Sequence, residues 1–219
     1  MIIAIDGPAA SGKSSIAKSL ADKLDFEYLS TGLMYRAVTA FILKNNLLKD
    51  FPNSVKNLIN SLNIEVDINN LNDIRINSVN YSEHYFSADV SNNVSLISSD
   101  ILVRSKLVEI QQKIAKRKNL VCEGRDIGSV VFPNADSKFY IDATIECRVM
   151  RRYNEFKDNK HKISKNDLKQ SLMERDSFDS SRKISPLVKA EDAILIDTTN
   201  LNIEEVDNIL CKHINGDIK

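Results

Sequence analysis

Short apolar runs alternate along this chain with longer segments in which apolar residues recur every three or four positions. Residues 2–5 form the first apolar run, and residues 13–24 carry apolar side chains at helical spacing. Such alternation is typical of an α/β protein whose parallel strands are buried between helices. Further short runs that read as strands lie at residues 27–29, 120–123, 138–142 and 194–197. The pattern therefore predicts a parallel sheet of about five strands flanked by helices.

The middle of the chain has a different pattern of apolar and polar residues. A helix is expected near residues 52–62, but residues 64 to about 86 alternate apolar and polar side chains as β-strands do. A long helix follows from residue 99 to about 118, with Ser99 or Asp100 as its N-cap. The expected layout is one domain over residues 1–219, made of a core at 1–62 and 100–219 and a small β-rich insertion at about 63–99.

The composition narrows the possible function classes. The 219 residues include 30 Lys plus Arg and 30 Asp plus Glu, so no net basic field exists to hold a nucleic-acid backbone. No stretch approaches about 18 apolar residues, and the N-terminus lacks a basic lead followed by an apolar region. The three cysteines and three histidines are scattered, without metal-ligand spacing. We expect a soluble, cytoplasmic, monomeric protein that binds neither nucleic acid nor membranes.

A phosphate-binding motif follows the first apolar run. Gly7, Gly12, Lys13 and Ser14 stand at the spacing G-x-x-x-x-G-K-[ST], between an expected strand and an expected helix. The glycines let successive backbone N–H groups point inward as an anion nest, Lys13 reaches the β- and γ-phosphates, and the Ser14 hydroxyl can hold Mg²⁺. A glycine turn that binds no nucleotide is the alternative, which the flanking strand and helix disfavour. The expected triphosphate-binding residues are Gly7, Pro8, Ala9, Ala10, Ser11, Gly12, Lys13, Ser14 and Ser15.

Basic residues at the same edge of the sheet indicate a second anionic ligand. The carboxyl ends of parallel strands meet at one edge, where ligands bind, and Arg36 and the segment 124–128 both follow expected strands. Arginine suits this task because it forms bidentate hydrogen bonds with phosphate. Arg125 and Asp126 lie between two glycines, which a structural Arg–Asp pair would also explain, and Arg36 taken alone also fits a solvated surface residue.

Two further groups of charged residues lie at helical spacing. Arg148, Arg151 and Arg152 share one helical face, where guanidinium groups repel one another unless an anion is near. This arrangement suits a mobile arginine flap that closes on a transferring phosphoryl group, and it also suits a solvated basic face. A second row consists of Arg175, Asp179 and Arg182, whose spacing of i, i+4 and i+7 also places them on one helical face. The alternative to a binding role for this row is a set of ordinary surface ion pairs.

Assembled, these segments resemble the bacterial cytidylate kinase family over nearly the whole chain. The most specific of them is 124–128 followed by 130–133. The other motifs are 5–15, Thr31-Gly32 with Tyr35-Arg36, 174–176 with Asp179 and Arg182, and Pro186-Leu187. The resemblance implies a P-loop nucleoside monophosphate kinase of pyrimidine metabolism, which transfers the γ-phosphoryl group of ATP to CMP or dCMP with Mg²⁺ as cofactor. It also implies a monophosphate-binding insertion and a helical arginine lid at about residues 145–165.

The same resemblance implies a role for each candidate residue. The implied catalytic residues are Lys13, Arg125, Arg148, Arg151 and Arg152, and Ser14 would hold Mg²⁺ through ATP. The acceptor phosphate would be held by Arg36 and Arg125, the cytosine by Ser95, Arg104 and Asp126, and the ribose region by Arg175, Asp179 and Arg182. Thr31 and Tyr35 complete the implied CMP-binding set.

The chain departs from the family pattern at two places. Ser30 stands where family members commonly have Asp, and residues 85–87 read Tyr-Phe-Ser where they often have Ile-Arg-Thr. Both departures concern acceptor binding and leave the phosphate machinery intact. The nearest alternative function is therefore another P-loop kinase, acting on UMP, AMP or a coenzyme precursor.

Two alternatives from other classes are disfavoured. A GTPase switch would need an Asn-Lys-x-Asp element to read guanine, and the sequence lacks it. A nucleic-acid-binding ATPase would need a basic, aromatic-rich stripe, which the balanced charge does not supply.

Overall fold

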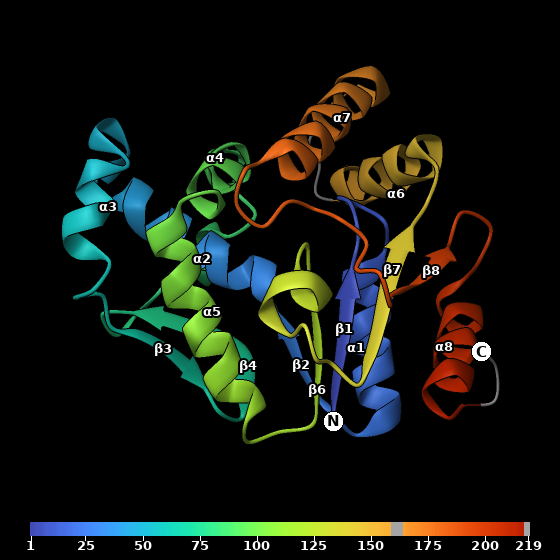
Figure 1. Cartoon of the computed structure of the whole chain (residues 1–219). Coiled ribbons are helices and arrows are strands. Elements are labelled where there is room, and N and C mark those ends of the chain that lie inside the picture. Colours follow the sequence, from blue (N-terminus) through green and yellow to red (C-terminus); the bar gives the residue numbers. More distant parts are fainter. Residues whose placement is uncertain (159–163, 217–219) are drawn as a thin grey trace. The chain divides into compact units, whose positions relative to one another are not determined.

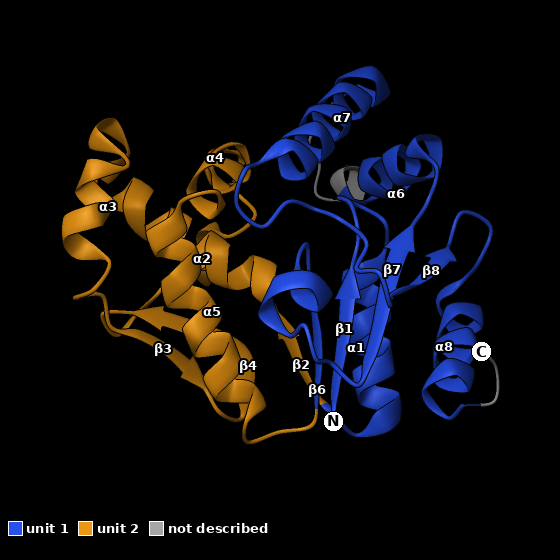
Figure 2. Cartoon of the chain, viewed as in Figure 1, with its two compact units in different colours: residues 1–26, 120–219 blue, residues 27–119 orange. Residues whose placement is uncertain are grey.

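The structure, a computed structural model, describes residues 1–158 and 164–216, without the side chains of residues 156–158. The chain divides into two compact units (Figure 2). Unit 1 consists of residues 1–26 and 120–219, and unit 2 of residues 27–119. This division is wider than the insertion expected at about residues 63–99, so the expected domain boundaries stay a prediction.

Unit 1 is built on parallel strands. The sheet has five strands in the order β2-β6-β1-β7-β8, and its four unit 1 strands pair in parallel. Most of their apolar residues are almost fully buried, as the short apolar runs predict, although Leu195 of the edge strand β8 is exposed. The predicted parallel α/β core is therefore confirmed. The strand bounds are β1 Ile2–Asp6, β2 Glu27–Ser30, β6 Leu120–Gly124, β7 Ser137–Asp142 and β8 Ile194–Asp197.

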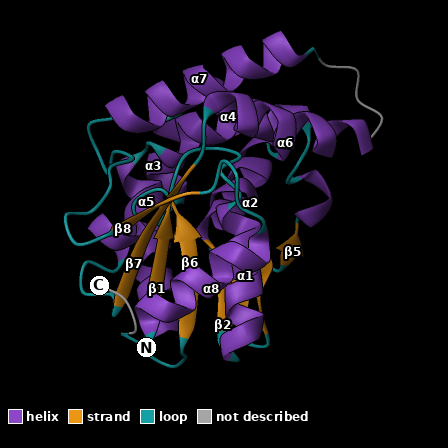
Figure 3. Ribbon diagram, turned by 90° about the vertical axis from the view of Figure 1, so that its right-hand side faces the viewer, coloured by secondary structure: helices purple, strands orange, loops and turns teal. Residues whose placement is uncertain are grey.

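The helices of unit 1 occupy two places relative to these strands. Helix α1 (Lys13–Leu24) packs against β1 and β6. Helix α8 (Ile203–Ile214) packs on α1, where Ser19 Oγ donates to Asp207 Oδ2 at 2.5 Å. Helices α6 and α7 pack on each other beyond the carboxyl ends of β1 and β7 (Figures 1 and 3). That edge therefore gathers the loops that follow the strands. The helix bounds are α1 Lys13–Leu24, α6 Ile145–Asp158, α7 Lys165–Ser181 and α8 Ile203–Ile214.

Unit 2 is helical with a small antiparallel sheet. The sheet has the order β3-β4-β5, and α2 and α4 pack on each other. Asp100 caps the long helix, because its Oδ1 accepts from the backbone N–H groups of Leu102 and Val103 at 2.9 and 3.0 Å. The bounds are α2 Thr31–Lys44, η1 Leu47–Asp50, α3 Asn53–Leu58, β3 Ile64–Asp67, β4 Asn70–Ile76, β5 Val79–Asn80, η2 Ser82–His84, α4 Ala88–Ser98 and α5 Ile101–Ala115.

The β-rich part of unit 2 is shorter than expected. Strand pairing was expected to about residue 86, but it ends at Asn80. There the Asn80 side chain accepts from the Ser82 N–H at 2.7 Å and turns the chain out of the sheet. Ser87 then caps α4 by accepting from the Val90 N–H at 3.3 Å. Beyond Asn80, local hydrogen bonds to side chains thus replace the hydrogen bonds between paired strands. None of the helices in the described ranges is long and apolar enough to cross a membrane.

Replacement of Gly7 by Ala is expected to destabilise the protein. A Cβ atom at Gly7 would lie 2.1 Å from the carbonyl oxygen of Ile141, a backbone atom of β7 that cannot move aside alone. Overpacking of this kind costs about 1–3 kcal/mol. Gly32→Ala is the control, because Gly32 lies in α2 with only Ser30 Oγ near, at 3.8 Å, and Ala favours a helix by up to about 1 kcal/mol. Urea unfolding should shift the two midpoints in opposite directions, and equal midpoints would contradict this account.

Candidate active site

The phosphate-binding loop joins β1 to α1 and has the backbone conformation that an anion nest requires. Gly7, Ala10 and Gly12 have positive φ angles of 155°, 59° and 90°. Gly12 is the N-cap of α1 and no side chain of the described residues caps this helix. The first N–H groups of α1 therefore point into the loop, where the helix dipole favours an anion.

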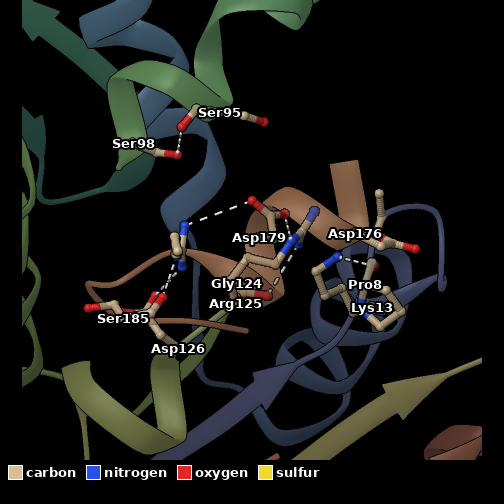
Figure 4. A network of polar contacts seen from close by, with 12 residues as sticks. Pro8, Lys13, Ser95, Ser98, Gly124, Arg125, Asp126, Asp176, Asp179 and Ser185 are labelled. Carbon is tan, nitrogen blue, oxygen red and sulfur yellow. Dashed lines mark hydrogen bonds and ion pairs between the residues drawn. The ribbon is translucent and has the colours of Figure 1, made fainter. Parts of the chain in front are cut away.

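Lys13 is buried in this loop. Its side chain is almost covered, and Nζ donates to the Pro8 carbonyl at 3.0 Å (Figure 4). Burial, with the Arg125 guanidinium nearby, lowers the pKa of Lys13 to about 7, although the Glu123 carboxylate raises it. An anion bound in the loop would offset the positive charge that surrounds this lysine.

Ser14 and Glu123 place two oxygen ligands side by side. Ser14 Oγ donates to Glu123 Oε1 at 3.1 Å, and Glu123, the last residue but one of β6, pairs with Ile5 of β1. Hydroxyl and carboxylate oxygens are the donors that Mg²⁺ prefers. The sequence motif predicts Ser14 for this task, whereas Glu123 is expected there only as the end of the strand at residues 120–123. The parallel register of β1 and β6 is the signal that brings Glu123 to the loop.

Asp6 fixes the segment that follows β6. Its Oδ1 accepts from the Ile127 N–H at 2.7 Å and its Oδ2 from the Gly128 N–H at 2.8 Å. Burial raises the pKa of Asp6 to about 6, although these two hydrogen bonds act in the opposite direction. The segment forms a π-helical turn, η3 Ile127–Val131, in which Val130 and Val131 N–H groups donate to the Asp126 carbonyl. Asp6 thereby holds the Gly124–Gly128 motif against the start of the phosphate loop.

The unit 1 half of the implied CMP set forms one ionic network (Figure 4). Arg125 Nε donates to Asp179 Oδ2 at 2.9 Å. Arg182 Nη2 lies 3.9 Å from Asp126 Oδ1, and Arg182 Nη1 lies 3.8 Å from Asp179 Oδ1. All four side chains are buried or nearly so. Arg175 also lies close enough to lower the pKa of Lys13.

One expectation about this row is wrong. Arg175, Asp179 and Arg182 were expected on one helical face, but α7 ends at Ser181 and Arg182 has the extended φ and ψ angles of −62° and 141°. Its side chain is turned back by a hydrogen bond from Nε to the Ser185 carbonyl. Helical spacing alone therefore does not position Arg182, because the extended backbone after the end of α7 also determines where its side chain lies.

Two of the lid arginines contact the phosphate loop. Arg148 Nη1 donates to the Ala9 carbonyl at 3.2 Å, and Arg151 Nη1 donates to the Ser11 carbonyl at 2.9 Å. Arg152 pairs with Glu155 of the same helix at 2.7 Å. Arg148 and Arg151 thus reach the phosphate loop from α6. Residues 159–163 of the expected lid lie outside the described residues.

The unit 2 half of the implied CMP set gathers around α2. Arg36 is buried, and its Nη1 donates to the Tyr85 carbonyl and, at 3.2 Å, to Ser91 Oγ. The exposed Phe86 ring lies over the same guanidinium, with its centroid 5.2 Å from Cζ. This ring stands where the family often has Arg, so a cation–π contact replaces a charge there.

Arg104 holds a second buried guanidinium in unit 2. Its Cζ lies 5.4 Å from the centre of the Tyr35 ring, and Nη1 donates to the Ser98 carbonyl at 3.0 Å. Ser98 Oγ in turn donates to the Ser95 carbonyl at 3.1 Å (Figure 4). Thr31, the first residue of α2, is buried. Unit 2 therefore contributes two buried guanidinium groups that backbone carbonyls hold in place.

The chain is similar to cytidylate kinases. The family model described as "Cytidylate kinase" matches residues 3–216. The cytidylate kinase of Fusobacterium nucleatum is 46% identical over 218 residues, which cover 98% of this chain and 97% of the relative. That of Clostridium botulinum strain Loch Maree is 46% identical over 215 residues, covering 98% of each. That of Clostridium tetani is 43% identical over 218 residues, covering 100% of this chain and 95% of the relative.

Solved structures share the fold at low sequence identity. The shikimate kinase of Acinetobacter baumannii in complex with shikimate has a TM-score of 0.52 at 14% identity, covering 99% of this chain and 93% of that chain. The protein TT1252 of Thermus thermophilus has a TM-score of 0.51 at 14% identity, covering 100% and 98%. At these identities the likeness establishes the fold alone.

Binding of a magnesium-bound nucleoside triphosphate is expected to take up protons at about pH 7. The phosphate charges raise the pKa of Lys13 from about 7, so a lysine that is partly neutral without nucleotide becomes fully protonated. Titration calorimetry in buffers of different ionisation enthalpy measures this uptake. Lys13→Arg is the control, because a guanidinium does not titrate in this range. The same proton uptake by both proteins would show that Lys13 is not its source.

Proposed function

Because the chain belongs to the cytidylate kinase family, we propose that it transfers the γ-phosphoryl group of ATP to CMP or dCMP, giving ADP and CDP or dCDP. The observation that carries this proposal is the charge arrangement at the phosphate loop. Lys13 is buried there, and Arg148 and Arg151 both reach loop carbonyls. Such a site neutralises a polyphosphate and the charge that develops on a transferring phosphoryl group.

The reaction needs positioning more than acid–base chemistry. An oxygen of the acceptor 5′-phosphate attacks the γ-phosphorus, and the bond from that phosphorus to the β,γ-bridging oxygen breaks, leaving ADP. The acceptor phosphate is already anionic, so no dedicated general base is required. Lys13, Arg148, Arg151 and Arg152 would neutralise the transferred group in a loose, in-line transition state.

Acceptor binding is proposed from the family resemblance together with the surroundings of each residue. Arg36 and Arg125 would hold the acceptor phosphate, and hydrogen bonds to the Tyr85 carbonyl and to Asp179 support their orientation. Cytosine offers acceptors at O2 and N3 and a donor at its N4 amino group. Arg104 would donate to the former and Asp126 would accept from the latter.

The remaining assignments complete the acceptor site. Ser95 would also contact the base, Thr31 and Tyr35 would line the acceptor region, and Asp179 would bind near the ribose. Arg175 and Arg182 would also bind near the ribose. Arg182 fits it because its guanidinium already lies within 4 Å of two carboxylates that could orient it, at 3.9 and 3.8 Å.

Magnesium fits the oxygen ligands of the donor half. Ser14 Oγ and Glu123 Oε1 lie 3.1 Å apart at the start of α1, as hard donors at a polyphosphate site. Bound there with ATP, Mg²⁺ would neutralise charge on the β- and γ-phosphates. We also propose a cytoplasmic monomer. Nucleic-acid binding is not expected, because positive and negative residues number 30 each and leave no net basic field.

CMP and dCMP are expected to be the best acceptors. ADP release should be measured with Mg-ATP and each of CMP, dCMP, UMP and AMP. Preference for UMP or AMP would mean that the chain is a kinase for that nucleoside monophosphate.

In the same assay Lys13→Met should lower turnover about 10²–10³-fold, because it removes a preorganised charge at the transferred group. Near-normal turnover of this variant would overturn the donor assignment.

Phe86→Ala is expected to raise the KM for CMP about two- to fivefold with little change in kcat. The substitution removes the ring over Arg36, and an exposed cation–π contact is worth about 0.5–1 kcal/mol. Ile68→Ala is a matched control, since Ile68 is an exposed apolar residue of the same unit. An unchanged KM for CMP in Phe86→Ala would mean that the ring does not orient Arg36.

A further inference from the structure

Asp176 bridges the phosphate loop and a lid arginine. It lies on α7, and its two carboxylate oxygens have different partners. Oδ1 accepts from the Ala9 backbone N–H at 3.2 Å, and Oδ2 accepts from Arg148 Nη1. Arg148 Nη1 also donates to the Ala9 carbonyl. The three residues therefore form a closed ring of hydrogen bonds, and Figure 4 shows Asp176 beside Pro8 and Lys13 of the loop.

The packing of this region does not depend on the carboxylate. Ala9 belongs to an apolar cluster with Val149 of α6 and with Leu168 and Leu172 of α7, and Tyr153 packs against it. This cluster already holds the two helices to the loop. The carboxylate therefore adds orientation to a contact that apolar burial stabilises.

The guanidinium of Arg148 is held along one side only. Nε donates to the Ala143 carbonyl at 3.1 Å and Nη1 to Asp176 and Ala9. Nη2 has no hydrogen-bond partner among the described residues. Five donors in a rigid fork can be aimed by fixing one edge, which leaves the other edge for a phosphoryl oxygen.

We propose that Asp176 is a positioning residue for the donor half of the site: it fixes Arg148 against the phosphate loop so that the guanidinium faces the transferring phosphoryl group. The inference rests on the proposed function, because it takes Arg148 as a residue that neutralises the transferred group. Asp176 itself acts only through Arg148 and Ala9.

A double-mutant cycle tests this coupling. Asp176→Asn keeps the size of the side chain but removes the charge that pairs with Arg148. It should lower kcat for CMP phosphorylation about tenfold to a hundredfold, the effect of misplacing a catalytic group by about 1 Å, with the KM for CMP unchanged within about twofold. In an Arg148→Ala background the same substitution should have no further effect on kcat.

Two controls separate positioning from folding. Asp167→Asn removes an exposed carboxylate from the start of the same helix and should leave kcat and both KM values unchanged. Urea unfolding of Asp176→Asn should give a midpoint near that of the unaltered protein, since the apolar cluster is intact. Equal losses of kcat from Asp176→Asn in both backgrounds, or no loss in either, would overturn the proposal.

Failure of the proposed function would be recognised separately. If the unaltered protein did not phosphorylate CMP, the function would be wrong, and the same cycle would be run on the Kd for Mg-ATP by calorimetry. Asp176→Asn should then weaken Mg-ATP binding only where Arg148 is present. Equal weakening in both backgrounds would overturn the inference independently of the acceptor.

Discussion

The buried carboxylate of Asp6 is the contact on which the donor half of the site depends. It ends β1 immediately before the phosphate loop and accepts from two successive backbone N–H groups of the segment after β6. A carboxylate enclosed in this way is costly to bury, and its raised pKa expresses that cost. The result is a fixed relation between Gly7, where the loop begins, and Arg125, whose charge reaches Lys13.

Around this fixed point the site balances positive charge with carboxylates. Lys13 lies near Arg125 and Arg175, and Glu123 and Asp179 offset part of their effect. Asp179 pairs with Arg125, and Asp176 pairs with Arg148. Arg125 and Arg148 are thus each oriented by an acid. Preorganised charge of this kind accelerates phosphoryl transfer without groups that must reorganise during the reaction.

In unit 2, backbone carbonyls help to orient two buried arginines. Arg36 and Arg104 are buried, Arg36 donates to the Tyr85 carbonyl, and Arg104 donates to the Ser98 carbonyl. A carbonyl that accepts from a guanidinium fixes its orientation, and the charged group can form strong hydrogen bonds with a phosphate or with an acceptor atom of a base. Aromatic rings of Phe86 and Tyr35 cover these cations and restrict them further.

By itself, the sequence determined the alternation of strands and helices, the phosphate loop and the family, because these depend on local periodicity and on motifs at short spacing. Tertiary structure alone decided which distant side chains meet. Glu123 reaches Ser14 through the register of β1 and β6, Asp176 reaches Ala9 through the packing of α7, and Arg182 turns back because its helix ends one residue earlier. No spacing along the chain encodes the contacts of Glu123 and Asp176, since each joins distant segments that only the folded sheet and its helices bring together.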